Sequence, residues 1–305
     1  MSWTRLGVVF APDGTKAWAR SHAALPVPVQ IGPDIFRFFF SSRDAGQRSH
    51  VGWVDVELSG QPRILQEASE PVLAPGADGT FDDSGIGIGC LTEADDGVRL
   101  YYMGWNLGAR AAWRNAIGFA QARTPFDHFE RFSPGPILDR SPEDPYTLSY
   151  PWVLRLGPQD WWMWYGSNLS ATATSAEMRH AIKLARSRDG VLWERDGATV
   201  IGFATADEYA IARPTVTKVG EVFLMGFACR GERYRIGSAS SVDGVHWTRI
   251  DAAMGLDPSS EGWDSQMTCY PALFWHREQL WLAYNGNGYG STGFGLAVWE
   301  GGYPI

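Results

Sequence analysis

Acidic side chains recur along the chain and are the first candidates for chemistry. As structural groups they would cap turns by accepting hydrogen bonds from backbone N–H groups. As functional groups they would face one another across a channel, where repulsion and partial burial separate their pKa values into those of an acid and a base. The structural interpretation is favoured for the repeated Asp, whereas Glu208 and Asp83 depart from the repeat and are better catalytic candidates. The recurring carboxylates are Asp82 and Asp83, Glu143 and Asp144, Asp207 and Glu208, and Asp264.

A second set of candidates stands directly before a recurring Pro or Gly. Arg213 in this set needs a partner if it lies near an axis, because an unpaired buried guanidinium is unfavourable. The partner could be an internal carboxylate such as Glu208, or an anionic ligand such as a phosphate or a carboxylate. Two Tyr hydroxyls in the set would add hydrogen bonds to that ligand, and His22, at a similar position, could shuttle a proton or contact it. The set is Leu25, Ile88, Tyr150, Arg213 and Tyr270.

The elements that must position these residues follow from a phrase that recurs five times. It reads SHAALPVPVQI, DDSGIGIGCL, DPYTLSYPWVL, DEYAIARPTV and DSQMTCYPALF. An aromatic-rich run and then a run with small residues at alternate positions follow each copy, which indicates three strands per unit. A fourth, weaker strand is suggested near Trp193 and Trp247, where Asp-Gly makes a hairpin turn. Registered on Pro26, Gly89, Pro151, Pro214 and Pro271, the copies stand 63, 62, 63 and 57 residues apart, a nearly constant period that indicates a repeat architecture.

Four antiparallel strands repeated around an axis make a propeller blade. The sequence therefore predicts an all-β, five-bladed β-propeller that spans residues 1–305 as a single domain, because no linker of changed composition interrupts the repeat. The segment from Trp3 is expected to pair beside the segment from Phe294 and to complete the last blade, since an open ring would leave an unpaired edge. Innermost strands converge on the axis of a propeller, so the candidate residues at the heads of the phrases should lie near one another.

Composition excludes several classes of partner. The net charge of −8, with 26 basic residues spread over 305, argues against nucleic acid or an anionic membrane surface. No apolar run is long enough to cross a bilayer and the first residues lack the core of a secretion signal, so a cytoplasmic location is expected. Cys90, Cys229 and Cys269 are odd in number and lack metal-type spacing, so neither a disulfide framework nor a zinc site is expected. No cofactor is expected, while a divalent ion at the axis and the oligomeric state stay open.

The chain resembles a known group of enzymes. Acidic residues at the axis of five predicted blades are typical of the furanosidase-type propellers of glycoside hydrolase families 32, 43, 62, 117 and 130. A bacterial group of glycosyl-hydrolase-like propellers, met in sugar or polysaccharide biosynthetic contexts, is more closely similar over essentially the whole chain. The phrases that carry this similarity are SHAALPVPV, FFFSSRD, GTFDDSGIG, YYMGWN, GPILDRSPEDPY, EYAIARPTV, GWDSQMTCYP and NGNGYGSTGFG.

The resemblance implies an enzyme that breaks or transfers a glycosidic bond. In the family 43 pattern, two carboxylates stand directly before a Pro and a third stands two residues before one. The matching positions here are Leu25, Tyr150 or Arg213, and Ala212, so no carboxylate occupies them. Family 130 phosphorylases need a single acidic residue, because inorganic phosphate is the nucleophile. Arg213, Tyr150, Tyr270 and His22 suit that chemistry better.

These considerations give a set of expected site residues. An inverting glycosidase needs an acid and a base about 6.5–9.5 Å apart, and Glu208 as acid with Asp83 or Asp264 as base could meet this across the channel. Partial burial would raise the pKa of the acid. Most aromatic residues are expected to be core, but Trp18, Trp105, Trp263 and Tyr289 are candidates to stack on a sugar. The substrate contacts are expected from Arg213, His22, Tyr150, Tyr270, Asp144, Asp82, Trp105, Trp263 and Tyr289.

Three hypotheses for the function stay open. The leading one is a glycoside hydrolase or phosphorylase-like enzyme acting on a carbohydrate or sugar-phosphate-like substrate. The alternatives are a non-hydrolytic sugar or natural-product tailoring enzyme and a sugar-binding propeller without turnover. The glycine-rich segment from Asn285 invites a nucleotide-binding interpretation, but no helix is expected after it to face a phosphate. Turn geometry is the favoured reason for its glycines.

Overall fold

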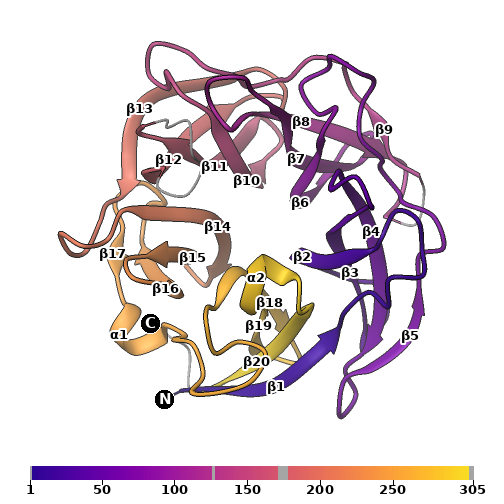
Figure 1. Ribbon diagram of the computed structural model, residues 1–305. Coiled ribbons are helices and arrows are strands. Elements are labelled where there is room, and N and C mark those ends of the chain that lie inside the picture. Colours follow the sequence, from indigo (N-terminus) through magenta and orange to yellow (C-terminus); the bar gives the residue numbers. More distant parts are fainter. Residues whose placement is uncertain (1, 126–127, 171–177, 302–305) are drawn as a thin grey trace.

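The structure, a computed structural model, describes residues 2–125, 128–170 and 178–301. It is nearly all-β, with 57% strand and 3% helix. Within the described chain, antiparallel pairing joins the strands into successive groups of four. Figure 1 shows these groups arranged around a common centre, with β2, β6, β10, β14 and β18 innermost.

The first group holds β2 (Ser21–Gln30), β3 (Ile35–Arg43), β4 (Ser49–Glu57) and β5 (Arg63–Glu67). The second holds β6 (Gly85–Ala94), β7 (Gly97–Leu107), β8 (Trp113–Ala122) and β9 (Glu130–Arg131). The third holds β10 (Leu148–Gly157), β11 (Asp160–Asn168), β12 (His180–Ser187) and β13 (Trp193–Ile201). The fourth holds β14 (Ala210–Val219), β15 (Val222–Arg230), β16 (Tyr234–Ser241) and β17 (Thr248–Arg249). The last holds β18 (Cys269–His276), β19 (Gln279–Asn285), β20 (Phe294–Glu300) and β1 (Ser2–Phe10); two short helices are α1 (Asp251–Met254) and α2 (Asn287–Gly290).

The three strands per unit that the sequence predicts are confirmed. A fourth strand is present in every described group, whereas the sequence pattern suggested one only near Trp193 and Trp247. The predicted pairing of the N-terminal segment is observed, because β1 runs antiparallel to β20 from Ser2 opposite Glu300 to Phe10 opposite Phe294. Single parallel bridges, Ser49 with Gly85 and His180 with Ala210, join neighbouring groups. No helix in the described ranges has the length and apolar character needed to span a membrane.

Aromatic side chains fill the space between neighbouring groups. The largest fully buried side chains are mostly aromatic and lie on the second strand of a group, such as Phe38, Tyr101 and Trp164. Large rings supply much buried apolar area, and small residues on the third strands leave room for them: a Cβ on Gly118 would lie 2.5 Å from the Phe81 ring. The core aromatics that the composition predicts are therefore present.

The innermost strands share an irregularity beside the registered Pro or Gly. Their pairing with the second strand shifts register at this point in every group. Such β-bulges re-aim side chains and are common near functional sites. In four groups the residue before the Pro has a left-handed backbone, which is unfavourable for a residue other than Gly. These residues are Leu25 (φ 59°), Tyr150 (φ 46°), Arg213 (φ 55°) and Tyr270 (φ 52°).

Candidate functional site

Asp144, at the head of β10, is fully buried among cations and hydroxyls. Its oxygens lie 2.9 Å from Lys183 Nζ and 3.1 Å from Arg195 Nη1, and Tyr165 donates its hydroxyl proton over 2.8 Å. Burial alone would raise the pKa of Asp144, but the hydrogen bonds from Lys183, Ser167 and Tyr165 outweigh it and lower the pKa. This carboxylate is fully buried in ion pairs and hydrogen bonds, so none of its surface is open to a ligand.

The same arrangement recurs in the loops that lead into two other innermost strands, β6 and β18; we call these entry positions the heads of the strands. Asp82 accepts hydrogen bonds from Tyr102 over 3.0 Å and from Arg131 over 2.8 Å. Asp264 accepts one from Tyr284 over 2.9 Å and pairs with Arg5 Nε at 3.2 Å. In each case the Tyr comes from the second strand of the group and an Arg comes from the fourth. The carboxylate therefore ties the head of the innermost strand to the outermost one.

Glu208 takes this position in the fourth group. Arg249, on β17, donates to Glu208 Oε1 over 3.0 Å, and the backbone N–H of Ala204 donates to Oε2 over 2.7 Å. Burial alone would raise the pKa of Glu208, but the bonds from Arg249 and Ala204 lower it overall. That direction is opposite to the one expected for a general acid.

The sequence suggested that Glu208 departs from the repeat, but in the structure Glu208 takes the place of the repeated Asp. It stands one residue nearer to its registered Pro than the other heads do, and its extra methylene makes up the reach to the outer strand. The substrate contacts expected of Asp82 and Asp144, and the catalytic roles expected of Glu208 and Asp264, would need exposed side chains, but all four are almost completely buried. We call this set the carboxylate ring: Asp82 (0% exposed), Asp144 (0%), Glu208 (5%) and Asp264 (2%).

Asp83 differs from the carboxylate ring. It is partly exposed, and its oxygens accept hydrogen bonds from the Gly79 backbone over 3.0 Å and from the Ser84 hydroxyl over 2.9 Å. No ion pair joins it to a basic residue in the part of the chain that the structure describes. The loop that holds it borders a cavity of about 440 Å³ whose lining includes Gly79, Thr80 and Arg114. Among the predicted catalytic carboxylates, Asp83 is the one that a ligand could reach.

Four tyrosines from different elements gather where the innermost strands begin. The hydroxyls of Tyr150 (β10) and Tyr270 (β18) are 3.2 Å apart. The ring centroid of Tyr289 (α2) lies 6.2 Å from that of Tyr270 and 5.8 Å from that of Tyr234 (β16). We call these residues the axial tyrosine cluster. All of them are partly or openly exposed, and Tyr289 is the most open at 36%.

A basic residue borders this cluster. Arg230 Nη1 donates to the Tyr289 hydroxyl over 3.4 Å, and its guanidinium lies over the rings of Tyr209 and Tyr234 at 5.4 and 5.3 Å. The sequence indicated Tyr150, Tyr270 and Tyr289 as site residues and missed Tyr234, Tyr209 and Arg230. Arg230 and Tyr234 stand at the facing ends of β15 and β16, outside the repeated phrase. Their place at that hairpin is the signal that could have found them.

His22 lies at the start of β2 and is neutral at ordinary pH. Its Nδ1 is 2.8 Å from the Ser21 hydroxyl. Burial, and then the charge of Arg43, lower the pKa of His22 to about 4. An imidazole in this state can accept a proton but is not a standing cation for an anionic ligand.

Arg213 is fully buried and lacks an acceptor. None of its three guanidinium nitrogens has a hydrogen-bond partner among the described residues. The suggested internal partner, Glu208, is bonded to Arg249 instead. The guanidinium carbon lies 5.4 Å from the centroid of the Trp152 ring, which offers a cation–π contact alone. Burial lowers the pKa of Arg213 to about 10, so the group still carries its charge at neutral pH.

The predicted sugar-stacking aromatics separate into buried and exposed ones. Trp18 is only 7% exposed, stacks on Phe40 and donates to the Ser69 carbonyl, so its proposed role is contradicted. Trp263 packs on Tyr284 with ring centroids 5.0 Å apart. Trp105 is partly buried and donates to the Ser49 hydroxyl over 2.9 Å. Tyr289 is the candidate most open to a ligand.

The glycine-rich segment around α2 serves turn geometry. Gly288, Gly290 and Gly293 have positive φ angles, which a side chain rarely adopts. Asn285, at its start, is fully buried and bonds across to β2, accepting from Leu25 N and donating to the Ala23 carbonyl, each over 2.8 Å. The segment therefore joins the last group to the first and presents Tyr289.

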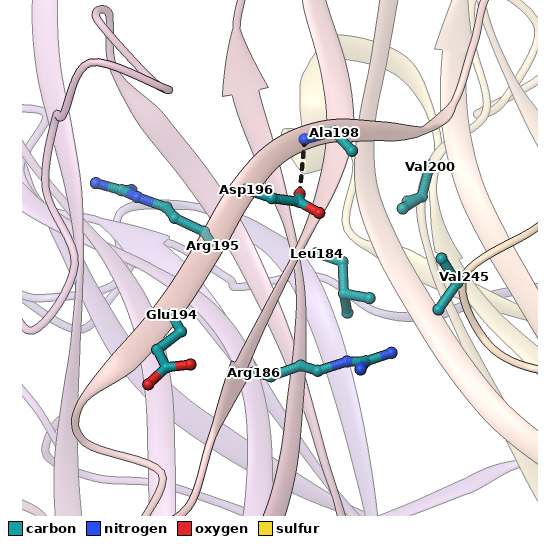
Figure 2. Close-up of a pocket in the computed structure, with 8 residues that line it drawn as sticks. All are labelled: Leu184, Arg186, Glu194, Arg195, Asp196, Ala198, Val200 and Val245. Atoms are coloured by element: carbon teal, nitrogen blue, oxygen red, sulfur yellow. Dashed lines mark hydrogen bonds between the residues drawn. The ribbon is translucent and has the colours of Figure 1, made fainter.

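Another cavity, of about 380 Å³, lies on the outer part of the molecule. Figure 2 shows Glu194, Arg195 and Asp196 along β13 on one side and Val245 on the other. Its lining includes Arg195, which pairs with Asp144 over 3.1 Å, and Asp196, which accepts a hydrogen bond from the Ala198 backbone. Three or more His, Cys, Asp or Glu side chains arranged for a metal are not found among the described residues.

Comparison with known proteins defines the class of the fold. No family profile matches the chain. A putative glycoside hydrolase from Bacteroides ovatus has a similar structure, with a TM-score of 0.75 and 14% identity over 99% of this chain and 97% of its own. A structure described under the family 130 mannoside phosphorylases and glycoside hydrolases gives 0.75 and 14% over 100% and 95%. A thermostable family 43 glycoside hydrolase gives 0.70 and 12% over 93% and 92%. The fold is thus of the glycoside-hydrolase-like propeller type.

Closer relatives place the chain in a family. The uncharacterized proteins Rv1502 and MT1551 of Mycobacterium tuberculosis are each 47% identical over 302 residues, which is 98% of this chain and 100% of theirs. The chain belongs to the family that these two mycobacterial proteins represent.

Proposed function

We propose that the chain is a carbohydrate-active enzyme built as one five-bladed propeller domain over residues 1–305. The five strand groups would be its blades, with β1 completing the last of them, and the heads of the innermost strands would form the substrate-binding end of the axis. Neighbours of the same fold are described as glycoside hydrolases and mannoside phosphorylases, which supports a sugar as the ligand.

The observation that carries this proposal is the axial tyrosine cluster with Arg230 at its border. Tyr rings offer apolar faces to the C–H surface of a sugar, and their hydroxyls offer hydrogen bonds to its oxygens. The partial exposure of Tyr289 gives a ligand access. Arg230 would bind a sugar hydroxyl or an acidic substituent, since a guanidinium suits carboxylates and phosphates.

For the reaction, we propose breakage or transfer of a glycosidic bond with Asp83 as the proton-transferring carboxylate. Asp83 is partly exposed and lies on a loop whose residues Gly79 and Thr80 line a cavity, whereas Glu208 and Asp264 are tied to cations. His22 would assist as a neutral base. The members of the carboxylate ring would then hold the blades together and take no part in the chemistry.

A second candidate function is sugar binding or tailoring without glycosidic cleavage. It is favoured by one observation: each described carboxyl group with a shifted pKa has that pKa lowered, as for Asp144 and Glu208. A hydrolase of the two-carboxylate kind needs one carboxyl group whose pKa is raised.

The test is a panel of glycosides, sugar phosphates and nucleotide sugars, each with and without inorganic phosphate. Binding and turnover are measured for the wild type, Tyr289→Ala, Asp83→Asn and the control Leu192→Ala, which removes an exposed side chain far from the cluster. We expect Tyr289→Ala to weaken binding at least tenfold, and Asp83→Asn to abolish turnover while binding persists. Unchanged binding in Tyr289→Ala would refute the site, and binding without turnover by the wild type would favour the second function.

A further inference from the structure

The buried guanidinium of Arg213 is an uncompensated charge. It is 0% exposed, and all three of its nitrogens lack an acceptor among the described residues. A buried cation without a paired charge or hydrogen bonds is strongly unfavourable, so folded proteins retain one only where something balances it. The ring of Trp152 at 5.4 Å supplies a weak contact that leaves the N–H groups unbonded.

The ionisable neighbours of Arg213 do not supply that balance. Its electrostatic neighbours are Cys90, Tyr150 and Tyr270. Burial raises the pKa of Cys90 to about 11, and it also raises the pKa values of Tyr150 and Tyr270. All three groups are therefore neutral at ordinary pH. Among the described residues no carboxylate forms an ion pair with Arg213, and the one closest in sequence, Glu208, is bonded to Arg249.

The position of Arg213 is constructed in the same way as that of the two tyrosines. Tyr150, Arg213 and Tyr270 each stand at the bulge before the registered Pro, and each has a left-handed backbone. Strained backbone of this kind is retained where it directs a side chain to a functional position. The paired hydroxyls of Tyr150 and Tyr270 thus belong to the same ring of bulge residues as the unbonded guanidinium.

We infer that the axis holds a compact anion bound by the Arg213 guanidinium, with the hydroxyls of Tyr150 and Tyr270 as further donors. The shared chemistry is a small halide or oxyanion. It could be a free ion, or the carboxylate or phosphate of an acidic sugar; the second source rests on the proposed function, whereas the site itself does not. Several N–H donors in a planar fork match such a group.

Thermal unfolding tests the site with chloride, acetate and inorganic phosphate as probes, at an ionic strength held constant with a bulky sulfonate salt. We expect at least one anion to raise the midpoint of the wild type saturably, by roughly 4–8 °C at about 100 times its Kd. Arg213→Met should not respond. The control Arg186→Met removes an exposed arginine that also lies over a Trp ring, at 4.2 Å, and should respond as the wild type does.

The order of the midpoints gives a second readout. Without anion, Arg213→Met should be at least as stable as the wild type, because it removes an unpaired buried charge; in saturating anion the order should reverse. If none of the three anions raises the midpoint of the wild type above its value in the sulfonate salt alone, or if Arg213→Met responds equally, the inference is overturned. If Arg213→Met does not fold, bromide-soaked wild-type crystals decide: anomalous density beside the guanidinium supports the site, and its absence overturns it.

A binding comparison separates the two sources of the anion. A uronic acid and the matching neutral sugar are titrated into the wild type and Arg213→Met in chloride-free buffer. Tighter binding of the acid by the wild type alone, by at least tenfold, assigns the anion to the ligand. Equal binding of both sugars together with a chloride or phosphate response assigns it to a free ion. Loss of neutral-sugar binding in Tyr289→Ala is independent of either result, so the failure of one proposal is distinguishable from failure of the other.

Discussion

In the carboxylate ring, Asp144 lies 2.9 Å from Lys183 Nζ and 3.1 Å from Arg195 Nη1, whereas at the axis the equally buried Arg213 has no described acceptor. Both regions place charge inside the protein and both belong to the innermost strands. The ring draws its counter-charges from the outer strands of the same groups. At Arg213 no described residue of an outer strand supplies an acceptor. A repeated fold can therefore neutralise charge at one radius and leave it available for a ligand at another.

The largest effect should come from breaking one member of the carboxylate ring. Asp144→Asn leaves Lys183 and Arg195 buried without their counter-charge, which should lower the free energy of unfolding by about 3–5 kcal/mol. Urea unfolding measures it. Asp95→Asn, which removes an exposed partner of Arg155, is the control and should change little. A loss in Asp144→Asn no greater than that of the control would contradict the comparison.

A smaller effect should follow from shortening Glu208. Glu208→Asp gives the fourth group the residue type of the other heads, yet it should lower the free energy of unfolding by about 2 kcal/mol, because the shorter side chain loses its hydrogen bonds with Arg249. Urea unfolding beside Glu208→Gln checks this. If Glu208→Asp is as stable as the wild type, the account of its reach is wrong.

Falling pH should protonate two buried histidines before it protonates the carboxylate ring. Burial lowers the pKa values of His22 and His180 to about 4, with Arg43 assisting at His22. The unfolded chain takes up protons near pH 6.5, so stability should fall as the pH drops from about 6.5 to about 4, by up to about 1.4 kcal/mol per pH unit for each His.

The carboxylate ring should respond at lower pH. The pKa values of Asp144 and Glu208 are lowered, so their contribution persists until the pH falls below the ordinary carboxyl range and is then lost. Unfolding measured across both windows distinguishes the two regions. His180→Gln should flatten the upper window only, and a profile identical to that of the wild type would show that His180 is not the group responsible.

The smallest effect should come from the axis itself. Tyr150→Phe removes the hydrogen bond between neutral hydroxyls, which should cost about 1 kcal/mol or less. Unfolding in anion-free buffer gives this value. In the presence of a bound anion the loss of stability should grow, because a donor to that anion is also removed. If the loss is the same with and without anion, Tyr150 is not part of the anion site.

Much of the fold could be predicted from the sequence, because each repeated phrase carries its own pattern of Pro, aromatic and small residues. The positions of the carboxylates in the ring could be predicted from the sequence, but the cations that bind them could not. Arg131 and Arg249 come from outer strands of two residues each, and Arg5 reaches Asp264 from the other end of the chain. The spacing of the phrase marks the place of a carboxylate and says nothing of the cation that meets it.

For Arg213, the need for a partner could be predicted from the sequence, but the absence of that partner among the described residues could not. The position of Arg213 before a registered Pro indicated that it lies near the centre, and its need for a partner followed from its charge. Its lack of an acceptor among the described residues depends on where the neighbouring side chains point, which the spacing of the sequence does not encode. Arg230 and Tyr234 were missed because they lie at a hairpin outside the repeated phrase.

The pairing of β1 with β20 has a consequence for how the chain folds. Ser2 lies opposite Glu300, and Trp3 donates to the Met254 carbonyl, so β1 has to wait for its partners until most of the chain has been synthesised. Contacts this distant in sequence slow folding, because the loop between them has to close first. A circular permutant that opens the chain between Phe10 and Ser21 and joins β20 to β1 by a short turn would make this pair a local hairpin. It should fold faster than the natural order of strands while keeping the same pairs.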